Sequence, residues 1–487
     1  MKAFSAQDIA AALSGELHGI EPDRILSAGV TTDSREVGPG DIYVARRGEH
    51  ADGLDFAPAA LEQGAALIIA EAVPSVDGTH LPTLLVSDAT EALGRLASLS
   101  VEALRASGDL TVVAITGSAG KTTVKDLAAD MLSAAGETVW PPNSYNNEVG
   151  VPLTALRAVE STRFLVLEMG ARSIGNLAYL TSLVRPDVAV ELMVGTAHSG
   201  VFGSIENTAR AKSELVQALA PGGTAVLNAD DPYVREMTQV LADGVEVVWF
   251  SASGRTEVAG GPAPVVSAAD VKVGASGRPS FDLTLPGAEP AHVDLALLGE
   301  HHVSNALAAA AVAHVCGVGD KSIVTTLRTS SAASRWRMEL VDSVSGITVL
   351  NDAYNANPDS MRQALKTLAA MGRGDEENPP RRTVAVIGEM LELGDESRQA
   401  HADIGELVVR LNIGRTVVVG EGARPVFQAA ELEGSWGSEA VFVPTLSEAR
   451  EVLRAELRPG DIVLFKSSRD SGLRFLGDEI AGVSQSA

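Results

Sequence analysis

The chain has 487 residues, of which 45% are hydrophobic and 21% charged, as in a globular protein of two to four domains. The 63 acidic and 38 basic residues give a net charge of −25, which argues against a general binder of nucleic acid or of anionic membranes. A single cysteine excludes an internal disulfide, and neither a signal-peptide pattern nor an apolar run of bilayer length is seen. We therefore expect a cytoplasmic protein with no integral membrane segment.

Residues 1–106 are expected to form a small α/β domain. Apolar segments typical of strands lie at 41–45, 66–70 and 81–86. Patterns typical of helices lie at 56–63 and 90–105. The Ser-Gly-Asp sequence at 107–109 predicts a linker to a second domain.

Residues 107–328 are expected to form a central domain with a parallel sheet, because strand and helix patterns alternate along it. The strand patterns lie at 110–116, 163–168, 187–194, 224–228 and 246–250. The helix patterns begin near Lys121, Ser173 and Ile205. Gly and Pro residues among alternating apolar positions at 251–298 predict an antiparallel addition, and an alanine-rich pattern predicts a helix over 301–316.

Residues 329–487 are expected to form a third domain, in which the strand and helix alternation resumes. Its strand patterns lie near 348–350, 383–387, 416–419 and 462–465. Gly, Asp, Glu and Pro at 372–380 predict a surface loop. The predicted fold class is α/β with three domains: a small α/β domain, a central parallel sheet like that of P-loop ATPases, and a C-terminal Rossmann-like domain.

Residues 110–123 combine an apolar, β-branched strand with two glycines and a helix that begins at Lys121. Glycines let backbone N–H groups face a phosphate, and a helix start adds partial positive charge. Lys121 would then reach the outer phosphates, and Thr122 would ligate magnesium. The expected nucleotide-binding residues are Gly117, Ser118, Ala119, Gly120, Lys121, Thr122 and Thr123. A full P-loop pattern has glycine where this chain has Ile115, so a plain glycine turn is the alternative.

Two further candidates lie near the carboxyl ends of predicted parallel strands, where open sheets bind their ligands, and a third lies within a helix pattern. Glu168 closes an apolar strand and suits magnesium, and a solvated strand end is the alternative. His198 follows the next strand, although a lone loop histidine is more commonly structural. Lys212 lies within a helix pattern and by itself would be an ordinary exposed lysine.

Two polar segments in the central domain offer ligand-binding groups. The Asn-rich segment 143–152 suits a recognition loop, because amides both donate and accept hydrogen bonds, and a simple turn is the alternative. His301 and Asn305 could frame an adenine, whereas capping of the helix by Ser304 or Asn305 is the plainer explanation.

The third domain begins with two further candidate segments. Residues 351–358 carry more hydrogen-bonding groups than a plain connection needs. Arg335 and Arg337 lie at the predicted junction with the central domain, where they could reach a nucleotide or form an inter-domain salt bridge.

These motifs occur in the order typical of the Mur ligases, and the chain resembles that family over nearly its whole length. The matching segments are Thr32-Asp-Ser-Arg, Pro39-Gly-Asp-Ile-Tyr-Val-Ala, Thr116-Gly-Ser-Ala-Gly-Lys-Thr-Thr, Asn146-Asn-Glu-Val-Gly-Val-Pro, Glu168-Met-Gly, Ala197-His, Lys212-Ser-Glu, Asn228-Ala-Asp-Asp, the spacing of Gly299, His301 and Asn305, and Trp336-Arg-Met-Glu. The family comprises ATP-dependent, amide-forming enzymes of peptidoglycan synthesis. Its phosphate loop, Thr-Gly-x-x-Gly-Lys-Thr, does not require glycine at 115.

Two segments, at 351–361 and 388–394, are similar to one kind of Mur ligase in particular. That ligase uses ATP to join D-alanyl-D-alanine to UDP-N-acetylmuramoyl-tripeptide through an acyl phosphate. The Asp-Asn-Pro-Arg signature of the preceding ligase is absent. The resemblance implies these two substrates as partners, ATP with two Mg²⁺ ions as cofactors, no nucleic acid, and a monomer.

The resemblance implies a catalytic set of Lys121, Glu168, His198, Lys212 and Arg337. Lys121 and Thr122 would hold the outer phosphates and one magnesium ion, and Glu168 and His198 would complete the metal shell. Lys212 matches a lysine that the family carries as a carbamate, an anion that would help to hold a second metal ion.

Ligand contacts are implied for the remaining matches. Asn305 would face the adenine, Asp352 the ribose, and Arg337 the phosphates from the third domain. The UDP-sugar would contact Ser34, Arg35, Asn146 and Asn147. The D-alanyl-D-alanine is expected near Asn355, Asn357 and Lys466.

The chain departs from the family at two positions, with Lys466-Ser-Ser-Arg in place of Lys-Gly-Ser-Arg and Asn351 where an acid is common.

Three functions are alternatives to a cell-wall ligase. A folylpolyglutamate synthase of the same fold would give Thr32-Asp-Ser-Arg no purpose. A P-loop kinase or GTPase would leave two domains unexplained, and the guanine-reading Asn-Lys-x-Asp segment is absent. A non-catalytic binding module is disfavoured because the catalytic set is complete.

Overall fold

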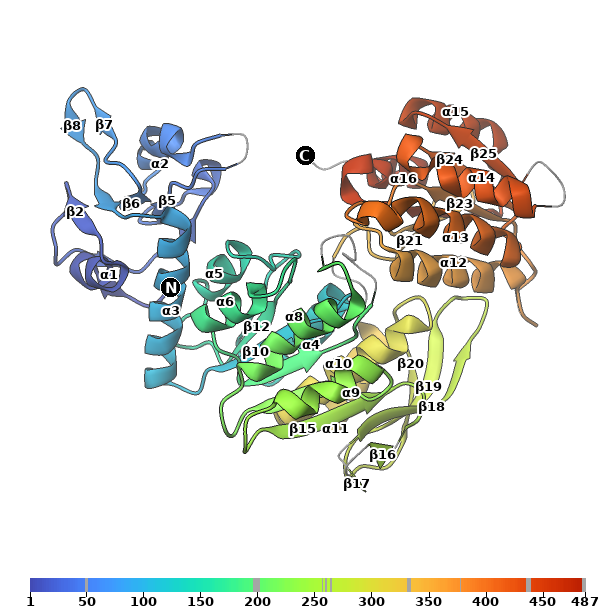
Figure 1. The fold of residues 1–487 in the computed structure, drawn as a ribbon, viewed down its shortest axis with the longest axis horizontal. Helices are drawn as coiled ribbons and strands as arrows, with labels where there is room; N and C mark the ends of the chain where they lie inside the picture. The colour runs from blue at the N-terminus through green and yellow to red at the C-terminus, as the bar shows by residue number, and fades with distance from the viewer. Residues whose placement is uncertain are drawn as a thin grey trace.

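A computed structural model describes residues 1–48, 51–195, 202–255, 257–258, 261–262, 265–330, 334–376, 378–434 and 439–483. Within these ranges three large sheets follow one another along the chain, from blue through green to red in Figure 1. Helices pack against each sheet, which confirms the predicted α/β class. In the same ranges, no helix has the length and apolarity needed to cross a membrane.

The first sheet has the strand order β2-β9-β6-β5-β4, in which only the β2 and β9 pair is antiparallel. Its strands are β2 (Glu16–His18), β4 (Val30–Thr31), β5 (Ile42–Val44), β6 (Leu67–Ala70) and β9 (Thr83–Leu85), and its helices are α1 (Ala6–Leu13), α2 (Ala57–Glu62) and α3 (Ala89–Ser107). Short pairs form from β1 (Phe4–Ser5) with β3 (Ile25–Leu26), and from β7 (Ser75–Val76) with β8 (Thr79–His80). The predicted strands and helices of this region are confirmed.

Helix α3 connects the first sheet to the second. Asp88 caps its start by accepting hydrogen bonds from two backbone N–H groups of the first turn, each 2.8 Å long. Its apolar side chains are buried against α1 and against the helices of the second sheet. In Figure 1 the helix runs between α1 and the pair α5 and α6. The helix continues through Ser107, so the predicted linker at 107–109 is wrong at its first residue.

The second sheet has the strand order β11-β12-β10-β13-β14-β15-β18-β19-β20. Neighbours from β11 to β18 are parallel, and β18, β19 and β20 are antiparallel, which confirms the predicted parallel sheet with its addition. The strands are β10 (Thr111–Thr116), β11 (Thr138–Val139), β12 (Phe164–Glu168), β13 (Val188–Glu191), β14 (Thr224–Asn228), β15 (Glu246–Ser251), β18 (Val265–Val273), β19 (Pro279–Thr284) and β20 (Ala291–Asp294). A separate antiparallel pair is β16 (Glu257–Val258) with β17 (Gly261–Pro262).

Helices cover both faces of the second sheet. One face carries α4 (Lys121–Ser133), α10 (His301–Val315) and α11 (Asp320–Thr329), and the other carries α5 (Gly150–Ala155), α6 (Asn176–Leu183), α8 (Ile205–Gln217) and α9 (Pro232–Glu236). Helix α10 is buried because it is apolar on nearly all sides, and its alanines let α4 approach closely. The predicted helix starts at Lys121 and Ile205 are confirmed, whereas α6 begins at Asn176 rather than near Ser173.

The third sheet has the strand order β21-β22-β26-β23-β24-β25, parallel except for β21. Its strands are β21 (Glu339–Asp342), β22 (Thr348–Asn351), β23 (Thr383–Ile387), β24 (Arg415–Val419), β25 (Ala440–Val443) and β26 (Ile462–Lys466). Helices α12 (Pro358–Arg373), α13 (Ser397–Arg410) and α14 (Arg424–Glu433) cover one face, and α15 (Leu446–Glu456) and α16 (Leu473–Ala481) cover the other. Helix α12 extends into the predicted loop at 372–380.

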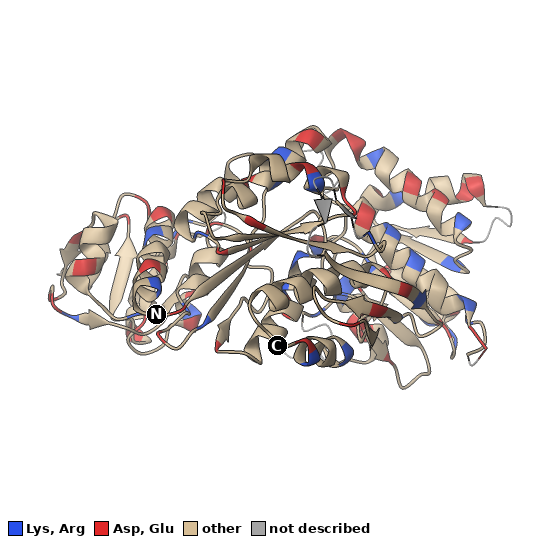
Figure 2. Cartoon of the chain, turned by 90° about the horizontal axis from the view of Figure 1, so that it is seen from below, with Lys and Arg blue, Asp and Glu red and all other residues tan. Residues whose placement is uncertain are grey.

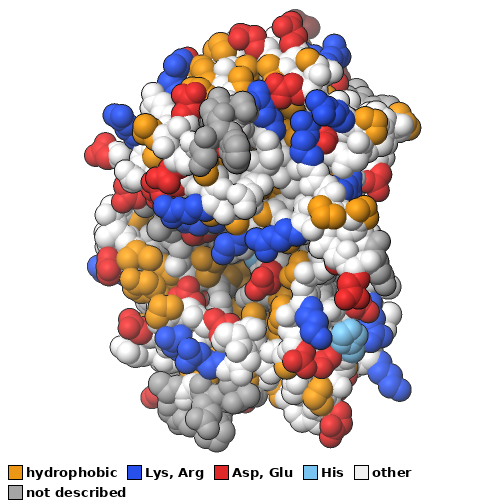
Figure 3. Space-filling view, turned by 90° about the vertical axis from the view of Figure 1, so that its right-hand side faces the viewer, with side chains coloured by type: hydrophobic (Ala, Val, Ile, Leu, Met, Phe, Trp, Pro, Cys, Tyr) orange, Lys and Arg blue, Asp and Glu red, His pale blue; other side chains and the backbone are white. Residues whose placement is uncertain are grey.

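Charged residues of both signs are interspersed on the outer helices and on the face shown in the space-filling view (Figures 2 and 3). The net charge of −25 is therefore not collected on one acidic face in these views. A phosphorylated ligand would need a local concentration of basic groups on such a chain.

Candidate active site

A cavity of about 900 Å³ lies where the second and third sheets meet. The phosphate loop lines it from the second sheet, with Ser118, Ala119, Gly120, Lys121, Thr122 and Thr123. The third domain contributes Arg337, Asp352, Tyr354, Asn355, Asn357, Lys466 and Arg469. The lining includes the basic side chains Lys121, Arg337, Lys466 and Arg469. The cavity is therefore a local basic site on a chain whose net charge is −25.

The phosphate loop has the geometry of an anion cradle. The backbone of Gly120 has a φ of +85°, and a Cβ atom there would collide with Oδ1 of Asn305. The Lys121 Nζ folds back and donates a hydrogen bond of 2.7 Å to the carbonyl oxygen of Gly117. Gly117 itself supports the loop and is not among the lining residues. A plain glycine turn would need neither the close approach of Asn305 to Gly120 nor the hydrogen bond of Lys121.

Glu168 closes β12 and is 1% exposed, so the solvated strand end weighed above is wrong. Its Oε2 accepts a hydrogen bond of 2.8 Å from Thr122, and its Oε1 accepts bonds of 2.5 Å from Ser144 and 2.7 Å from Asn146. The segment at 143–152 therefore does more than turn the chain. Burial opposes ionisation of Glu168, but the charges of Lys121 and Arg337 and these hydrogen bonds outweigh it and hold the pKa below its usual value.

Two lysines with lowered pKa values share the site. Burial is the main cause that lowers the pKa of Lys121, and the nearby charge of Glu168 opposes that shift. Lys212 on α8 is 4% exposed and lines the cavity, so it is not an ordinary surface lysine. Burial, aided by the charge of Lys121, lowers the pKa of Lys212 to about 7, against the opposing charge of Glu191.

Glu191, which closes β13, is a buried group that the sequence analysis missed. It is fully buried, and no described residue donates a hydrogen bond to either of its carboxylate oxygens. Burial raises its pKa to about 8, while the charge of Lys212 works in the other direction. Its position after an apolar strand is the same sequence signal that singled out Glu168.

Asn305 lies beside the phosphate loop, on α10. Its Nδ2 is 3.0 Å from the His302 Nδ1, and its side chain lines the cavity. The start of α10 has no side-chain cap, so the capping role weighed for Ser304 or Asn305 is wrong. His301 also lines the cavity, and burial lowers its pKa to about 4, so its ring is neutral at pH 7.

The third domain brings a buried ion pair to the cavity. The Lys466 Nζ lies 2.6 Å from Oδ2 of Asp352 and donates a hydrogen bond of 2.8 Å to the carbonyl oxygen of Asn355. Arg337 lines the same cavity, with its Cζ 4.3 Å from the centre of the Tyr354 ring. The salt bridge weighed for this segment is made by Arg335, which pairs with Asp478 of the third domain and not with the central domain.

The remaining candidates are not all found at the cavity. Ser34 and Arg35 form part of a short 3₁₀ turn in the first domain and do not line the cavity. His198 lies outside the described residues. Among the described residues, no three His, Cys, Asp or Glu side chains form a cluster that could hold a metal ion. The lining residues Asn146, Asn147, Asn355 and Asn357 do join the phosphate loop at the cavity.

Family models match all three parts of the chain. The Mur ligase family, catalytic domain matches residues 27–100, the Mur ligase middle domain matches 115–313, and the Mur ligase, glutamate ligase domain matches 336–469. The chain belongs to the Mur ligase family, as the relatives described next also show.

Curated relatives narrow the comparison within that family. A UDP-N-acetylmuramoyl-tripeptide–D-alanyl-D-alanine ligase from Mycobacterium leprae is 41% identical, covering 96% of this chain and 96% of its own length. The ligase of the same name from Escherichia coli is 33% identical, covering 95% of this chain and 94% of its own.

Solved structures of the family have the same fold as this chain. MurF from Acinetobacter baumannii superposes with a TM-score of 0.83 at 29% identity and covers 99% of both chains. MurF from Thermotoga maritima, solved in complex with ADP, has a TM-score of 0.75 at 27% identity and covers 93% of this chain and 96% of its own.

Proposed function

We propose that the chain is an ATP-dependent ligase that joins D-alanyl-D-alanine to UDP-N-acetylmuramoyl-tripeptide in peptidoglycan precursor synthesis. The observation that carries the proposal is that the phosphate loop lines the same cavity as Arg337, Asp352 and Lys466 of the third domain. Relatives that carry this activity in their name, and that match nearly the whole chain, support the choice of substrates. ATP and UDP-linked precursors are cytoplasmic metabolites, so we place the reaction in the cytoplasm.

The proposed chemistry follows from the poor reactivity of a carboxylate toward an amine. The terminal carboxylate of the tripeptide takes the γ-phosphoryl group of ATP, and the amine of D-alanyl-D-alanine then displaces phosphate from the acyl phosphate. Lys121 and Arg337 would offset the repulsion between the anions as they meet. Water would hydrolyse the acyl phosphate, so a cavity lined by two domains suits this reaction.

The nucleotide contacts are proposed as follows. The loop residues 117–123 would hold the phosphates, with Lys121 at the outer ones and Arg337 approaching from the third domain. Asn305 would face the adenine and Asp352 the ribose, which fits their positions at the cavity wall.

Magnesium fits the oxygen-rich group formed by Glu168 and Thr122, whose side chains already meet at 2.8 Å. We propose that these residues, His198 and a carbamylated Lys212 would hold two ions, which supply positive charge beside the phosphates. A lysine reacts with carbon dioxide as the neutral amine, and the pKa of about 7 for Lys212 gives that form a large share at neutral pH.

The substrate contacts and domain limits are also part of the proposal. The UDP-sugar would contact Ser34, Arg35, Asn146 and Asn147, and D-alanyl-D-alanine would lie near Asn355, Asn357 and Lys466. We propose domains at 1–106, 107–328 and 329–487, because each large sheet falls inside one of them. We expect a monomer.

Phosphate release tests the function directly. The purified chain is given ATP, Mg²⁺, UDP-N-acetylmuramoyl-tripeptide and D-alanyl-D-alanine, and product is followed by mass. We expect release that requires both substrates and that disappears in Lys121→Ala. Release supported by a folate and glutamate, and not by the cell-wall substrates, would instead identify a folylpolyglutamate synthase.

A further inference from the structure

Residues 334–338, here called the strap, carry Arg337 from the central domain to the third sheet. At one end, the Ser334 Oγ donates a hydrogen bond of 2.7 Å to Asp126 on α4. At the other end, the Met338 N–H donates one of 3.0 Å to Oδ1 of Asp352. The strap is therefore attached to both sides of the cavity, and Arg337 lies between the two attachments.

The backbone of the strap is strained on both sides of Arg337. Trp336 has a φ of +59° and Met338 a φ of +52°, in the left-handed region that non-glycine residues rarely adopt. Such a conformation persists only where surrounding contacts impose it. The contacts that hold Trp336 and Met338 consequently decide where Arg337 points.

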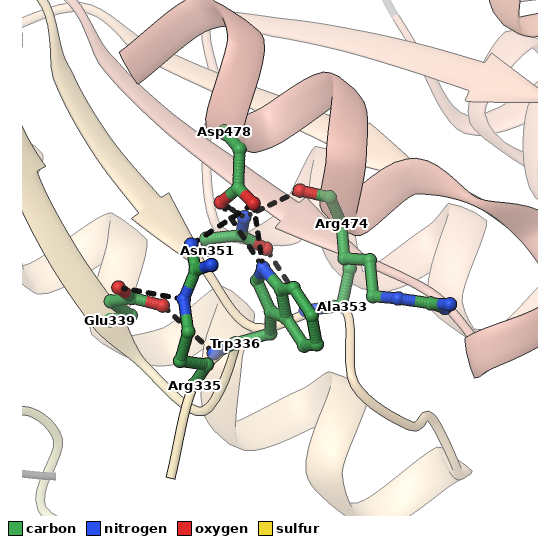
Figure 4. A network of polar contacts seen from close by, with 7 residues as sticks. All are labelled: Arg335, Trp336, Glu339, Asn351, Ala353, Arg474 and Asp478. Carbon is green, nitrogen blue, oxygen red and sulfur yellow. Dashed lines mark hydrogen bonds and ion pairs between the residues drawn. The ribbon is translucent and has the colours of Figure 1, made fainter. Parts of the chain in front are cut away.

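Asp478 on α16 contacts the side chains of both Arg335 and Trp336 in the first half of the strap (Figure 4). This carboxylate is 3% exposed and accepts hydrogen bonds of 3.0 Å from the Arg335 Nη2 and from the Trp336 Nε1. The Trp336 ring also packs edge-on against Phe475, with ring centres 5.8 Å apart. The polar contacts of the Trp336 side chain therefore come from α16, while its backbone N–H donates a hydrogen bond of 2.9 Å to Glu339.

Asn351 completes the surroundings of this carboxylate. It is 2% exposed at the end of β22, and its Nδ2 donates to Oδ1 of Asp478 at 3.1 Å and to the carbonyl oxygen of Arg474 at 2.9 Å. An aspartate at 351 would place two buried carboxylates against each other. The amide instead donates a hydrogen bond to the buried carboxylate of Asp478.

Arg337 itself is held by few polar contacts. Its Nε is buried, and no described residue accepts a hydrogen bond from it. It lines the same cavity as Lys121 and Glu168, which places the guanidinium toward the phosphate loop. Apart from its contact with the Tyr354 ring, its direction is consequently set by the strap.

We propose that Asp478 is a positioning residue of the nucleotide site: through Trp336 and Arg335 it holds the strap so that Arg337 faces the phosphate loop. This inference rests on the proposed function, because it takes the loop and Arg337 to bind ATP. Asp478 does not line the cavity, so it acts on the nucleotide through Arg337 and makes no contact with it.

A double-mutant cycle tests the proposal, with calorimetric affinity for a non-hydrolysable ATP analogue and Mg²⁺ as the readout. Arg337→Ala and Asp478→Asn are each expected to weaken binding on the order of tenfold. The double variant should bind no more weakly than Arg337→Ala alone, because Asp478 acts through Arg337. Two effects that multiply, or an unchanged affinity in Asp478→Asn, would overturn the proposal.

Trp336→Phe provides a milder second variant, since it removes the Nε1 donor and keeps the ring. We expect a smaller loss of affinity, which again disappears in the Arg337→Ala background. The matched control is Asp461→Asn, another carboxylate that is 3% exposed and is paired at 2.6 Å with an arginine, Arg382, beside the same sheet. It should lower the midpoint of thermal unfolding and leave the analogue affinity unchanged, and an equal loss of affinity would contradict the proposal.

The ligation assay separates this inference from the proposed function. If the unaltered chain binds the analogue but makes no product from the two cell-wall substrates, the proposed function fails and the coupling between Asp478 and Arg337 still decides the inference. If the unaltered chain binds no nucleotide, both fail.

Discussion

Glu168 and Glu191 close the two strands that flank β10, and both are buried, yet their surroundings differ completely. Glu168 pairs in register with Ile115 and faces α4, where three side chains donate hydrogen bonds to it. Glu191 pairs one residue further on, with Thr116, and so faces the side covered by α8. No described residue donates to it there.

The difference shows that burial alone does not decide the charge of a carboxylate. Donated hydrogen bonds and nearby cations hold the pKa of Glu168 below its usual value despite burial. Without donors, burial raises the pKa of Glu191 to about 8. Glu168 is therefore ionised at neutral pH and suited to bind a cation. Glu191 keeps its proton up to about pH 8.

The largest expected effect is on turnover, through Glu168. Glu168→Gln keeps the shape of the side chain and removes the charge that Thr122, Ser144 and Asn146 surround. Phosphate release should fall on the order of a thousandfold, because the proposed magnesium site loses its carboxylate. Glu137→Gln, in a surface carboxylate of the same domain, is the control and should keep its turnover. If the Glu168→Gln chain keeps more than about a tenth of normal turnover, the charge of Glu168 is not needed for the reaction.

The next effect is on stability, through Glu191. In the unfolded chain its pKa is near 4.5, and in the folded chain it is about 8. Between these pH values the folded state binds a proton that the unfolded state has released, so raising the pH favours unfolding until about pH 8. Glu191→Leu should therefore raise the free energy of unfolding at pH 8 by on the order of 3 to 5 kcal/mol, and by much less at pH 5.

Urea denaturation of the unaltered chain and Glu191→Leu at pH 5, 6.5 and 8 measures this prediction. The difference in the free energy of unfolding between the two chains should grow as the pH rises. A difference that stays constant with pH would mean that Glu191 is ionised in the folded state, and Glu191 would then not differ from Glu168 in charge.

The smallest effect tests one donor of Glu168. Ser144→Ala removes the hydrogen bond of 2.5 Å to Oε1 and leaves those from Thr122 and Asn146. Since that bond favours the charged form, its loss should raise the pKa of Glu168 and move the acidic limb of the kcat/KM profile to higher pH. At neutral pH we expect a loss of about threefold to tenfold.

The control for that experiment is Ser133→Ala, at the far end of α4, where the hydroxyl donates to the carbonyl oxygen of Ala129. Its kcat/KM profile should coincide with that of the unaltered chain. If Ser144→Ala also leaves the acidic limb in place, the donors do not set the charge of Glu168.

Local sequence predicted the elements that carry the site, because strand, glycine turn and helix start are all encoded within residues 110–123. The short strands β11, β21 and β25 were not predicted, since segments of two to four residues show little periodicity. Asn305 was assigned to adenine from family resemblance, while its contact with Gly120 depends on the packing of α10 against α4. Asp478 had no sequence signal, because its partners are more than 120 residues away along the chain.

The sequence by itself determined the α/β class, the family, the phosphate loop and the order of the three sheets, because these follow from short periodic patterns and local motifs. The tertiary structure decided which buried charges have partners. Ser144 and Asn146 reach Glu168 from 24 and 22 residues away, and a register offset of one residue turns Glu191 to the other face. Charge states depend on such distant donors, and only the packed chain brings them together.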